Sequence, residues 1–138
     1  MEQNIIVTGG AGFIGSHCAD FLIEKGYKVV IIDDLSFGQK KNVNHNAIFI
    51  ERDISNMKDI EDVIVGYKPS HIFHFAANAT TKSTSMGWKN PINDYKINMV
   101  GTLNLLEILR KNNIDSHFIY ASTAAVYGEP KTIPINEN

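Results

Sequence analysis

The sequence predicts an α/β fold built on a doubly wound, mostly parallel β-sheet. Five short apolar runs alternate with polar or amphipathic stretches, and each run is continuous rather than alternating in hydropathy. Such runs are typical of strands that helices cover on both faces. A glycine-rich turn, VTGGAGFIG, directly follows the first run. With right-handed crossovers, these features predict the strand order 3-2-1-4-5 and a ligand crevice at the carboxyl ends of the strands, between strands one and four.

The elements are expected in the following order along the chain. The strands are the apolar runs at residues 4–9, 28–34, 47–53, 71–77 and 117–123. Apolar spacing predicts helices at residues 13–26, 56–67 and 92–113. Gly26 ends the first helix, Ser55 or Asn56 caps the second, and Pro91 begins the third. Residues 35–46 are polar and predict a loop or a short helix.

Composition excludes several classes of protein. The chain has 138 residues, the size of one domain, and a net charge of −2 with acids and bases intermixed. No nucleic-acid or membrane partner is therefore expected. Cys18 is the single cysteine, which excludes an internal disulfide and favours a reducing, cytoplasmic location. We expect no signal peptide and no bilayer span. No metal site is expected, because the cysteine and histidines lack ligand spacing.

The glycine-rich turn has the context of a dinucleotide-binding loop, because it joins a predicted strand to a predicted helix. Gly9 allows the tight turn, and Gly12 lets the backbone approach a pyrophosphate at the helix N-terminus. Gly15 lets the helix pack close to the strand. The alternative is a glycine turn that binds no ligand.

Asp33 ends the second strand, where an acidic residue accepts hydrogen bonds from an adenosine ribose. A carboxylate there repels a 2′-phosphate, and no arginine neighbours it in the sequence, which favours NAD over NADP. The neighbouring Asp34 could share this role. The alternative is that Asp33 only caps the next turn.

Three further stretches, HFAA, NMVGTLNLLE and YASTAAVYG, complete a pattern. With the glycine loop, they resemble the extended short-chain dehydrogenase/reductase superfamily, and within it the NAD-dependent epimerase/dehydratase family. The resemblance covers essentially the whole chain. It implies a Rossmann-like fold, a nucleotide-sugar substrate and a homodimer. The dimer would form through the long helix, with Val100, Leu103 and Leu106 among its apolar residues.

The resemblance also assigns roles to residues at matching positions. Asp53 and Ile54 would reach the adenine, the HFAA segment would line the nicotinamide side, and Asn98 would support the pocket. For Phe75, plain strand core is an equal alternative. Together with the loop, the expected cofactor-binding set is Gly9, Gly12, Phe13, Ile14, Gly15, Asp33, Asp34, Asp53, Ile54, Phe75, Ala76, Ala77 and Asn98.

Thr123 matches the catalytic Ser/Thr of the family, whose hydroxyl would bond the reacting sugar hydroxyl. Ser122 is its close competitor, and a hydroxyl that only satisfies the strand end is the structural alternative. In dehydratases of the family an acidic pair would lie near this position. Here Ala124 and Ala125 follow, which argues against a dehydratase.

Tyr127 and Lys131 have the Y-x-x-x-K spacing of the superfamily's acid/base pair. That pair must share one helix face, so that the ammonium lowers the tyrosine pKa. Pro130 lies between them and excludes a regular helix. We therefore interpret YGEPK as a decoy, and the resemblance places the true pair further along a longer chain.

Residues 1–138 are then expected to be the N-terminal, NAD-binding part of a sugar-nucleotide epimerase, with later strands and the substrate subdomain absent. Such a part would be inactive alone. A nucleotide-sugar dehydratase or decarboxylase of the same superfamily is one alternative. A non-catalytic NAD-binding module is another, although a hydroxyl at Thr123 favours catalytic ancestry.

Overall fold

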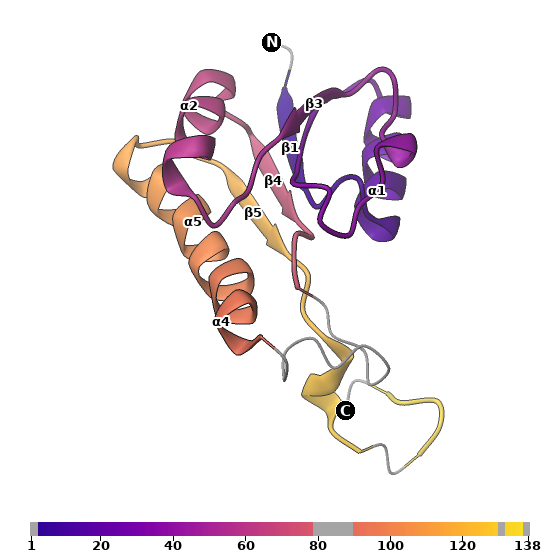
Figure 1. The fold of residues 1–138 in the computed structure, drawn as a ribbon. Coiled ribbons are helices and arrows are strands. Elements are labelled where there is room, and N and C mark those ends of the chain that lie inside the picture. Colours follow the sequence, from indigo (N-terminus) through magenta and orange to yellow (C-terminus); the bar gives the residue numbers. More distant parts are fainter. Residues whose placement is uncertain (1–2, 79–89, 130–131, 137–138) are drawn as a thin grey trace.

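A computed structural model describes residues 3–78, 90–129 and 132–136 of the chain. In these residues, one sheet contains β1 (Asn4–Thr8), β2 (Lys28–Asp33), β3 (Ile48–Glu51), β4 (His71–His74) and β5 (His117–Tyr120) (Figure 1). The strands lie in the order β3-β2-β1-β4-β5, and all neighbouring pairs are parallel. The predicted order 3-2-1-4-5 is therefore confirmed.

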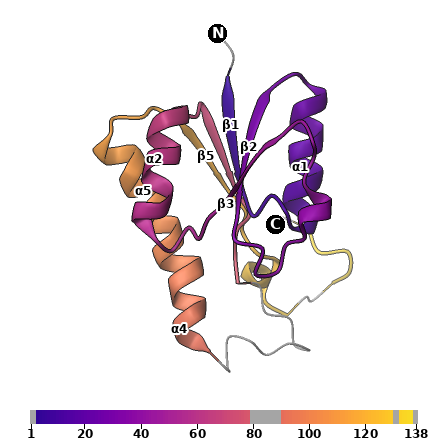
Figure 2. The ribbon, with the colours of Figure 1, turned by 45° about the horizontal axis from the view of Figure 1, so that its top comes forward.

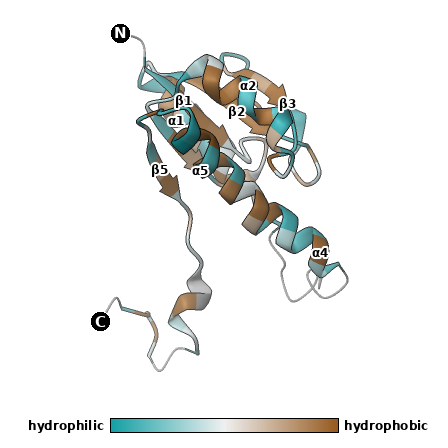
Figure 3. Cartoon of the chain, turned by 90° about the vertical axis from the view of Figure 1, so that its left-hand side faces the viewer, coloured by the Kyte–Doolittle hydropathy of each residue, from teal (hydrophilic) through white to brown (hydrophobic). Residues whose placement is uncertain are grey.

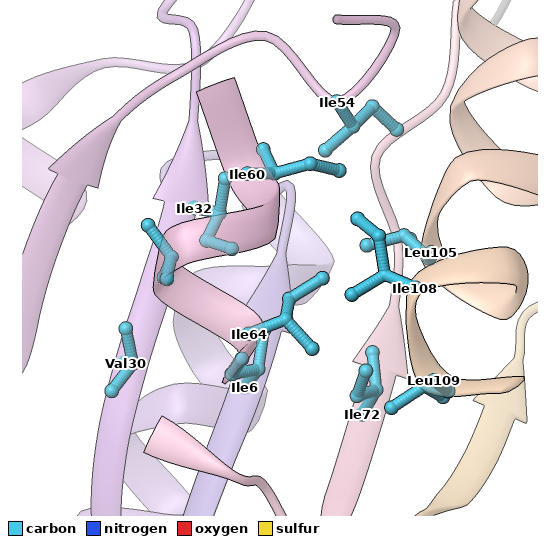
Figure 4. Close-up of a cluster of buried hydrophobic side chains, with 11 residues drawn as sticks. Ile6, Val30, Ile32, Ile54, Ile60, Ile64, Ile72, Leu105, Ile108 and Leu109 are labelled. Atoms are coloured by element: carbon cyan, nitrogen blue, oxygen red, sulfur yellow. The ribbon is translucent and has the colours of Figure 1, made fainter. Parts of the chain in front are cut away.

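Helices cover both faces of this sheet. Helix α1 (Phe13–Glu24) lies on one face, and α2 (Met57–Tyr67) and α5 (Thr102–Lys111) lie on the other (Figures 1 and 2). Alternate residues of one strand enter different cores: Ile6 packs with α2 and α5, whereas Ile5 and Val7 pack with α1. The larger core is shown in Figure 4. Two buried faces explain why the strands are continuously apolar.

The long helix differs from a regular α-helix. It begins with α4 (Pro91–Asp94), continues as the π-helical segment η2 (Tyr95–Gly101), and ends with α5. The side chain of Asn90 caps its start by accepting a hydrogen bond from the Asn93 N–H at 3.1 Å. The sequence predicts the helix correctly but gives no sign of the π segment. Apolar and polar bands alternate along its length in Figure 3.

The other helix boundaries follow local chemistry. Gly26, with φ of +84°, ends α1 in the left-handed conformation that glycine adopts easily. Asn56 occupies the N-cap position of α2, but its side chain makes no cap bond. The predicted short helix between β2 and β3 is the 3-10 turn η1 (Lys40–Asn42). Among the described helices, none is both long and apolar enough to cross a bilayer.

All five strands end earlier than predicted: β1 at Thr8 and β2 at Asp33 by one residue, and the other three by two or three residues. β3 ends at Glu51, β4 at His74 and β5 at Tyr120, so the predicted ends at residues 53, 77 and 123 are wrong. For β4 the cause is its partner: β1 ends at Thr8, which pairs with His74, and the chain then turns at Gly9. The residues beyond the last strand pairs are thus released from the sheet and become available to line a crevice.

Candidate functional site

Two adjoining cavities lie at the carboxyl ends of the strands. The first cavity is lined by Gly9, Gly12, Ile32–Asp34, Ser36–Gly38, Arg52–Ile54, Phe75–Ala77 and Ile97. The second cavity is lined by Gly9, Gly12–Gly15, His74–Asn78, Asn98, Thr102 and Tyr120–Thr123. Both share the glycine loop and the segment after β4. This is the crevice that the strand order predicts.

The glycine loop connects β1 to α1 and lines both cavities. Gly9 has a φ of +70°, and a Cβ on it would lie 2.6 Å from the Ala76 nitrogen. A Cβ on Gly15 would collide with the Gly9 carbonyl, so this glycine lets α1 approach the loop rather than the strand itself. Phe13 and Ile14 are exposed in the first turn of α1, which contains no acidic residue. The positive end of the helix therefore remains available to an anion.

Asp33 is nearly buried, with 8% of its surface exposed. Its Oδ2 accepts a hydrogen bond from the Ala11 N–H at 2.9 Å, and its Oδ1 accepts one from the Leu35 N–H at 2.8 Å. The carboxylate therefore caps the turn that follows β2, which is the alternative role considered for Asp33. Each oxygen still has capacity for another donor, because an ionised carboxylate offers about four acceptor positions.

Asp34 and Asp53 line the same first cavity in similar turns. Asp34 Oδ1 accepts hydrogen bonds from both the N–H and the hydroxyl of Ser36, at 2.9 and 2.6 Å. Asp53 accepts from the N–H and the hydroxyl of Ser55, each at 2.8 Å. These contacts fix the carboxylates before any ligand arrives.

Arg52 lies near Asp33 in the structure, although the sequence indicates no arginine beside that residue. No arginine neighbours Asp33 in the sequence, but Arg52 lines the first cavity with it. The Arg52 N–H donates to the Asp33 carbonyl at 3.3 Å, because β3 pairs with β2 and Glu51 lies opposite Asp33. The predicted strand order could have revealed this neighbour. The lining residues Ser36, Phe37, Gly38 and Ile97 were also missed.

Ile54 connects the first cavity to the long helix. It is 4% exposed, and a Cβ on Gly101 would lie 2.6 Å from its Cδ1. The glycine in the helix, which is about 1 kcal/mol less favourable than alanine, therefore permits close packing against Ile54. The partner of Gly101 is the loop before α2 rather than a strand.

The segment after β4 forms the wall between the cavities. Phe75, Ala76 and Ala77 line both of them. Phe75 also packs at the edge of the core beneath α1, where its ring centroid lies 6.3 Å from that of Phe73. Phe75 therefore belongs both to the core beneath α1 and to the lining of the cavities.

Asn98 holds the end of this segment in place. Its Oδ1 accepts a hydrogen bond from the Asn78 N–H at 2.8 Å. Its Nδ2 donates to Asp94 Oδ1 at 2.9 Å and to the Asn78 carbonyl at 3.4 Å. This geometry agrees with a supporting role for Asn98.

Thr123 and Ser122 both line the second cavity, so the lining does not distinguish between the two candidates for the catalytic hydroxyl. They lie in the turn after β5 rather than at its end, and the Thr123 carbonyl accepts a hydrogen bond from the Val126 N–H at 3.2 Å. Tyr120, which the sequence analysis did not single out, lines the same cavity.

Tyr127 is half exposed and is not among the residues that line either cavity. It ends the 3-10 turn η3 (Ala124–Tyr127), and Gly128 follows with a φ of +65°, which a right-handed helix does not contain. Lys131 lies outside the described residues. In the part of the chain that the structure describes, no group of three or more His, Cys, Asp or Glu residues could hold a metal ion.

Comparisons with known proteins agree with this geometry. A family model described as GDP-mannose 4,6 dehydratase matches residues 6–138. A putative UDP-glucose 4-epimerase of Methanocaldococcus jannaschii is 44% identical over 97% of this chain and 43% of its own length. The UDP-glucose 4-epimerase of Thermotoga maritima, crystallised with UDP-glucose, superposes with a TM-score of 0.85 at 42% identity, covering 95% of this chain and 41% of that one.

A second solved structure is the UDP-glucose 4-epimerase of Thermus thermophilus in complex with NAD. It gives a TM-score of 0.87 at 35% identity and covers 98% of this chain and 43% of its own. The chain thus spans less than half the length of each of these relatives.

Proposed function

This chain belongs to the NAD-dependent epimerase/dehydratase family, and we propose that it is the NAD-binding part of a sugar-nucleotide epimerase. UDP-glucose and UDP-galactose, interconverted at C4, are the proposed substrates of the whole protein. The reasons are the relatives named UDP-glucose 4-epimerase and the two-part crevice. The proposal treats residues 1–138 as one NAD-binding domain and retains the cytoplasmic location inferred from the single cysteine.

The observation that carries the proposal is the position of Asp33 beside the glycine loop, joined to it through the Ala11 N–H. An extended dinucleotide would have its pyrophosphate at the N-terminus of α1 and its adenosine ribose at Asp33. The adenine would then lie along Asp53 and Ile54. The nicotinamide half would enter the second cavity, against Ala76 and Ala77.

In the whole enzyme, NAD would supply a reversible hydride acceptor for the sugar carbon. This chain would contribute the Thr123 hydroxyl, which would hydrogen-bond the sugar hydroxyl that loses its proton and orient it. The general base would be a Y-x-x-x-K tyrosine further along a longer chain. A dehydratase is the second candidate, because the matching family model carries that description. The alanines after Thr123, where an acidic pair would lie, favour the epimerase.

Calorimetric titration of the 138-residue chain with NAD and, separately, with UDP-glucose tests the cofactor assignment. We expect NAD to bind, UDP-glucose alone to bind weakly, and no epimerisation to occur. A folded chain that releases no heat with NAD at millimolar concentration would contradict the proposal. The reading frame beyond Asn138 supplies a second test, since a Y-x-x-x-K at the start of a helix is expected there.

We also propose that the whole protein is a homodimer joined through α4, η2 and α5. The apolar residues Ile92, Tyr95, Met99, Leu103 and Leu106 are exposed at spacings of three and four along this helix. Leu105, Ile108 and Leu109 face the core instead, and Val100 is half-buried. An exposed stripe of this kind suits pairing with a second helix.

Sedimentation of a Leu103→Asp variant tests the dimer. In a dimer paired through this helix, the new carboxylate would be buried without a partner, which is unfavourable. We expect the variant to be monomeric at concentrations where the parent protein is dimeric. Lys58→Asp on the exposed side of α2 introduces the same side chain away from the stripe and should leave the dimer intact. A parent protein that is monomeric at high concentration would refute the dimer.

A further inference from the structure

His74 is the last residue of β4 and lies between the sheet and the long helix. Its surface is 2% exposed, although it belongs to the lining of the second cavity. Its Nδ1 lies 2.6 Å from the Thr8 hydroxyl, and its Nε2 lies 2.9 Å from the Thr102 hydroxyl. One imidazole ring thus joins β1 to the start of α5.

The direction of these hydrogen bonds follows from the hydroxyl of Thr102. That hydroxyl donates its only proton to the Asn98 carbonyl at 2.7 Å, so toward His74 it can only accept. The ring proton must then be on Nε2. Consequently Nδ1 is the acceptor, and the Thr8 hydroxyl donates to it.

The other side of Thr8 completes the chain of hydrogen bonds. Because its proton points to His74, its oxygen is free to accept, and the Ala76 N–H donates to it at 3.3 Å. Every donor therefore has an acceptor in the order Ala76, Thr8, His74, Thr102, Asn98. In the opposite tautomer, Nε2 would need a proton that Thr102 already gives to Asn98.

A charged ring fits this environment poorly. An imidazolium donates from both nitrogens, which would leave the Thr8 proton without an acceptor. The rings of Phe118 and Tyr120 lie with centroids 5.6 and 5.8 Å away. Burial lowers the pKa of His74 to about 4, in agreement with a neutral ring.

Both ends of this network act on the wall between the cavities. At one end, Thr8 holds the Ala76 N–H. At the other, Asn98 uses its side chain to hold Asn78. Thr102 also bonds to a carbonyl four residues earlier, at the π segment η2, where helices commonly carry functional sites.

We propose that His74, as the neutral Nε2–H tautomer, is a positioning residue that fixes the Ala76–Asn78 wall for the nicotinamide half of the cofactor. This inference rests on the proposed binding of NAD. It does not make His74 a catalytic residue, because its two ring nitrogens already bond to protein hydroxyls.

The tautomer is tested first, without any ligand, by ¹⁵N NMR of the histidine rings in the 138-residue chain. The proton of His74 is expected on Nε2 alone, with Nδ1 showing the shift of an unprotonated acceptor at neutral pH. A proton on Nδ1, a mixture of tautomers or an imidazolium would overturn the inference. This result does not depend on NAD.

Calorimetry with NAD then tests the positioning role. Thr102→Val keeps the shape of the side chain but removes its hydroxyl, and we expect roughly tenfold weaker NAD binding. Thr102→Ser restores the hydroxyl and should restore the affinity. His71→Asn, at the other end of β4, changes a histidine outside the network and should leave the affinity for NAD unchanged.

The outcomes separate the two proposals. If the parent chain does not bind NAD, the proposed function fails, and the ring spectrum alone decides whether the network exists. If the parent binds NAD while a folded Thr102→Val chain binds it equally well, the positioning role is refuted and the cofactor assignment stands. Circular dichroism confirms that each variant is folded.

Discussion

The polar side chains that line the two cavities are held in place in different ways. In the first cavity, Asp33, Asp34 and Asp53 each accept a hydrogen bond from the backbone N–H two residues later. In the second, His74 bonds to Thr8 and Thr102, which are 66 and 28 residues away in the sequence. The carboxylates of the first cavity are thus each held by a local turn, whereas the histidine of the second cavity is held by residues from distant elements.

Substitutions in the two cavities should therefore have different structural consequences. A substitution of one of these carboxylates should leave the other two in place, because each has its own local turn. A change in the second cavity propagates from β1 to the long helix, because each side chain there holds the next.

The largest effect is expected at Thr123 in the second cavity, in a protein that carries this chain together with the rest of the epimerase. Thr123→Ala should lower turnover of a UDP-hexose roughly 10²-fold, because the hydrogen bond that we propose from its hydroxyl to the reacting oxygen would be lost. Tyr127→Phe, outside the lining of both cavities, should keep most of the turnover. Coupled epimerisation assays measure both, and a thousandfold loss with a folded Tyr127→Phe enzyme would make YGEPK the active pair.

His74 should make stability depend on pH. Its pKa is about 4 in the folded chain against an ordinary value of 6.5. Between these values the unfolded chain binds a proton that the folded chain excludes, so stability falls as the pH drops from 6.5 toward 4. The loss is at most about 3 kcal/mol.

Urea unfolding at several pH values measures that loss, and NMR titration of the His74 ring gives its pKa directly. His71→Asn should keep the pH dependence, because it leaves the buried ring in place. A His74 that titrates near 6.5 in the folded chain would contradict both the burial and the network.

Asp33 should have a smaller effect, limited to the cofactor. Asp33→Asn removes the charged acceptor that we propose for the ribose and should weaken NAD binding about tenfold, since hydrogen bonds to charged groups are worth roughly 1.5–3 kcal/mol. NADP should lose less, because a repulsive charge near its 2′-phosphate is also removed. Glu24→Gln, at the exposed end of α1 and outside the lining of both cavities, removes the same charge and is the control. Equal losses for NAD and NADP would remove the ribose assignment.

Substitution of Arg52 should have the smallest effect on cofactor binding, and that effect should be measurable only when residue 33 is uncharged. In the Asp33→Asn background, Arg52→Gln should weaken NADP binding a few-fold and leave NAD nearly unchanged, because an exposed charge pair is worth about 0.2–1 kcal/mol. Calorimetry with both cofactors measures this. If Arg52→Gln leaves NADP binding unchanged, the guanidinium does not face the 2′ position.

The sequence predicted what is local or periodic. The three helices, the tight turn at Gly9 and the positions of Asp33 and Asp34 depend on patterns that span a few residues. The strand order follows from the order of the elements and from right-handed crossovers, and Asp53 was assigned by the resemblance. The resemblance added Asn98, Ala76 and Thr123, which no local pattern identifies. The NAD-dependent epimerase/dehydratase family and its fold were likewise correctly identified from these motifs.

The remaining features required contacts between distant residues. The early end of β4 depends on where β1 stops, and the position of Arg52 depends on the register of β3 with β2. The ring of His74 looked like ordinary strand core, because nothing near it in the sequence marks Thr8 and Thr102 as partners. The π segment has no local signal such as proline or glycine pairs at its start.

Ile54 presents one side to the first cavity and meets Gly101 with the other. A methyl group at residue 101 would lie 2.6 Å from the end of that side chain, so it would require Ile54 to become smaller or move. Residues 54 and 101 are therefore expected to change together over evolution. A residue larger than glycine at position 101 should be accompanied by a residue smaller than isoleucine at position 54. Relatives in which residue 54 changes the shape of the first cavity should therefore also differ at residue 101 of the long helix.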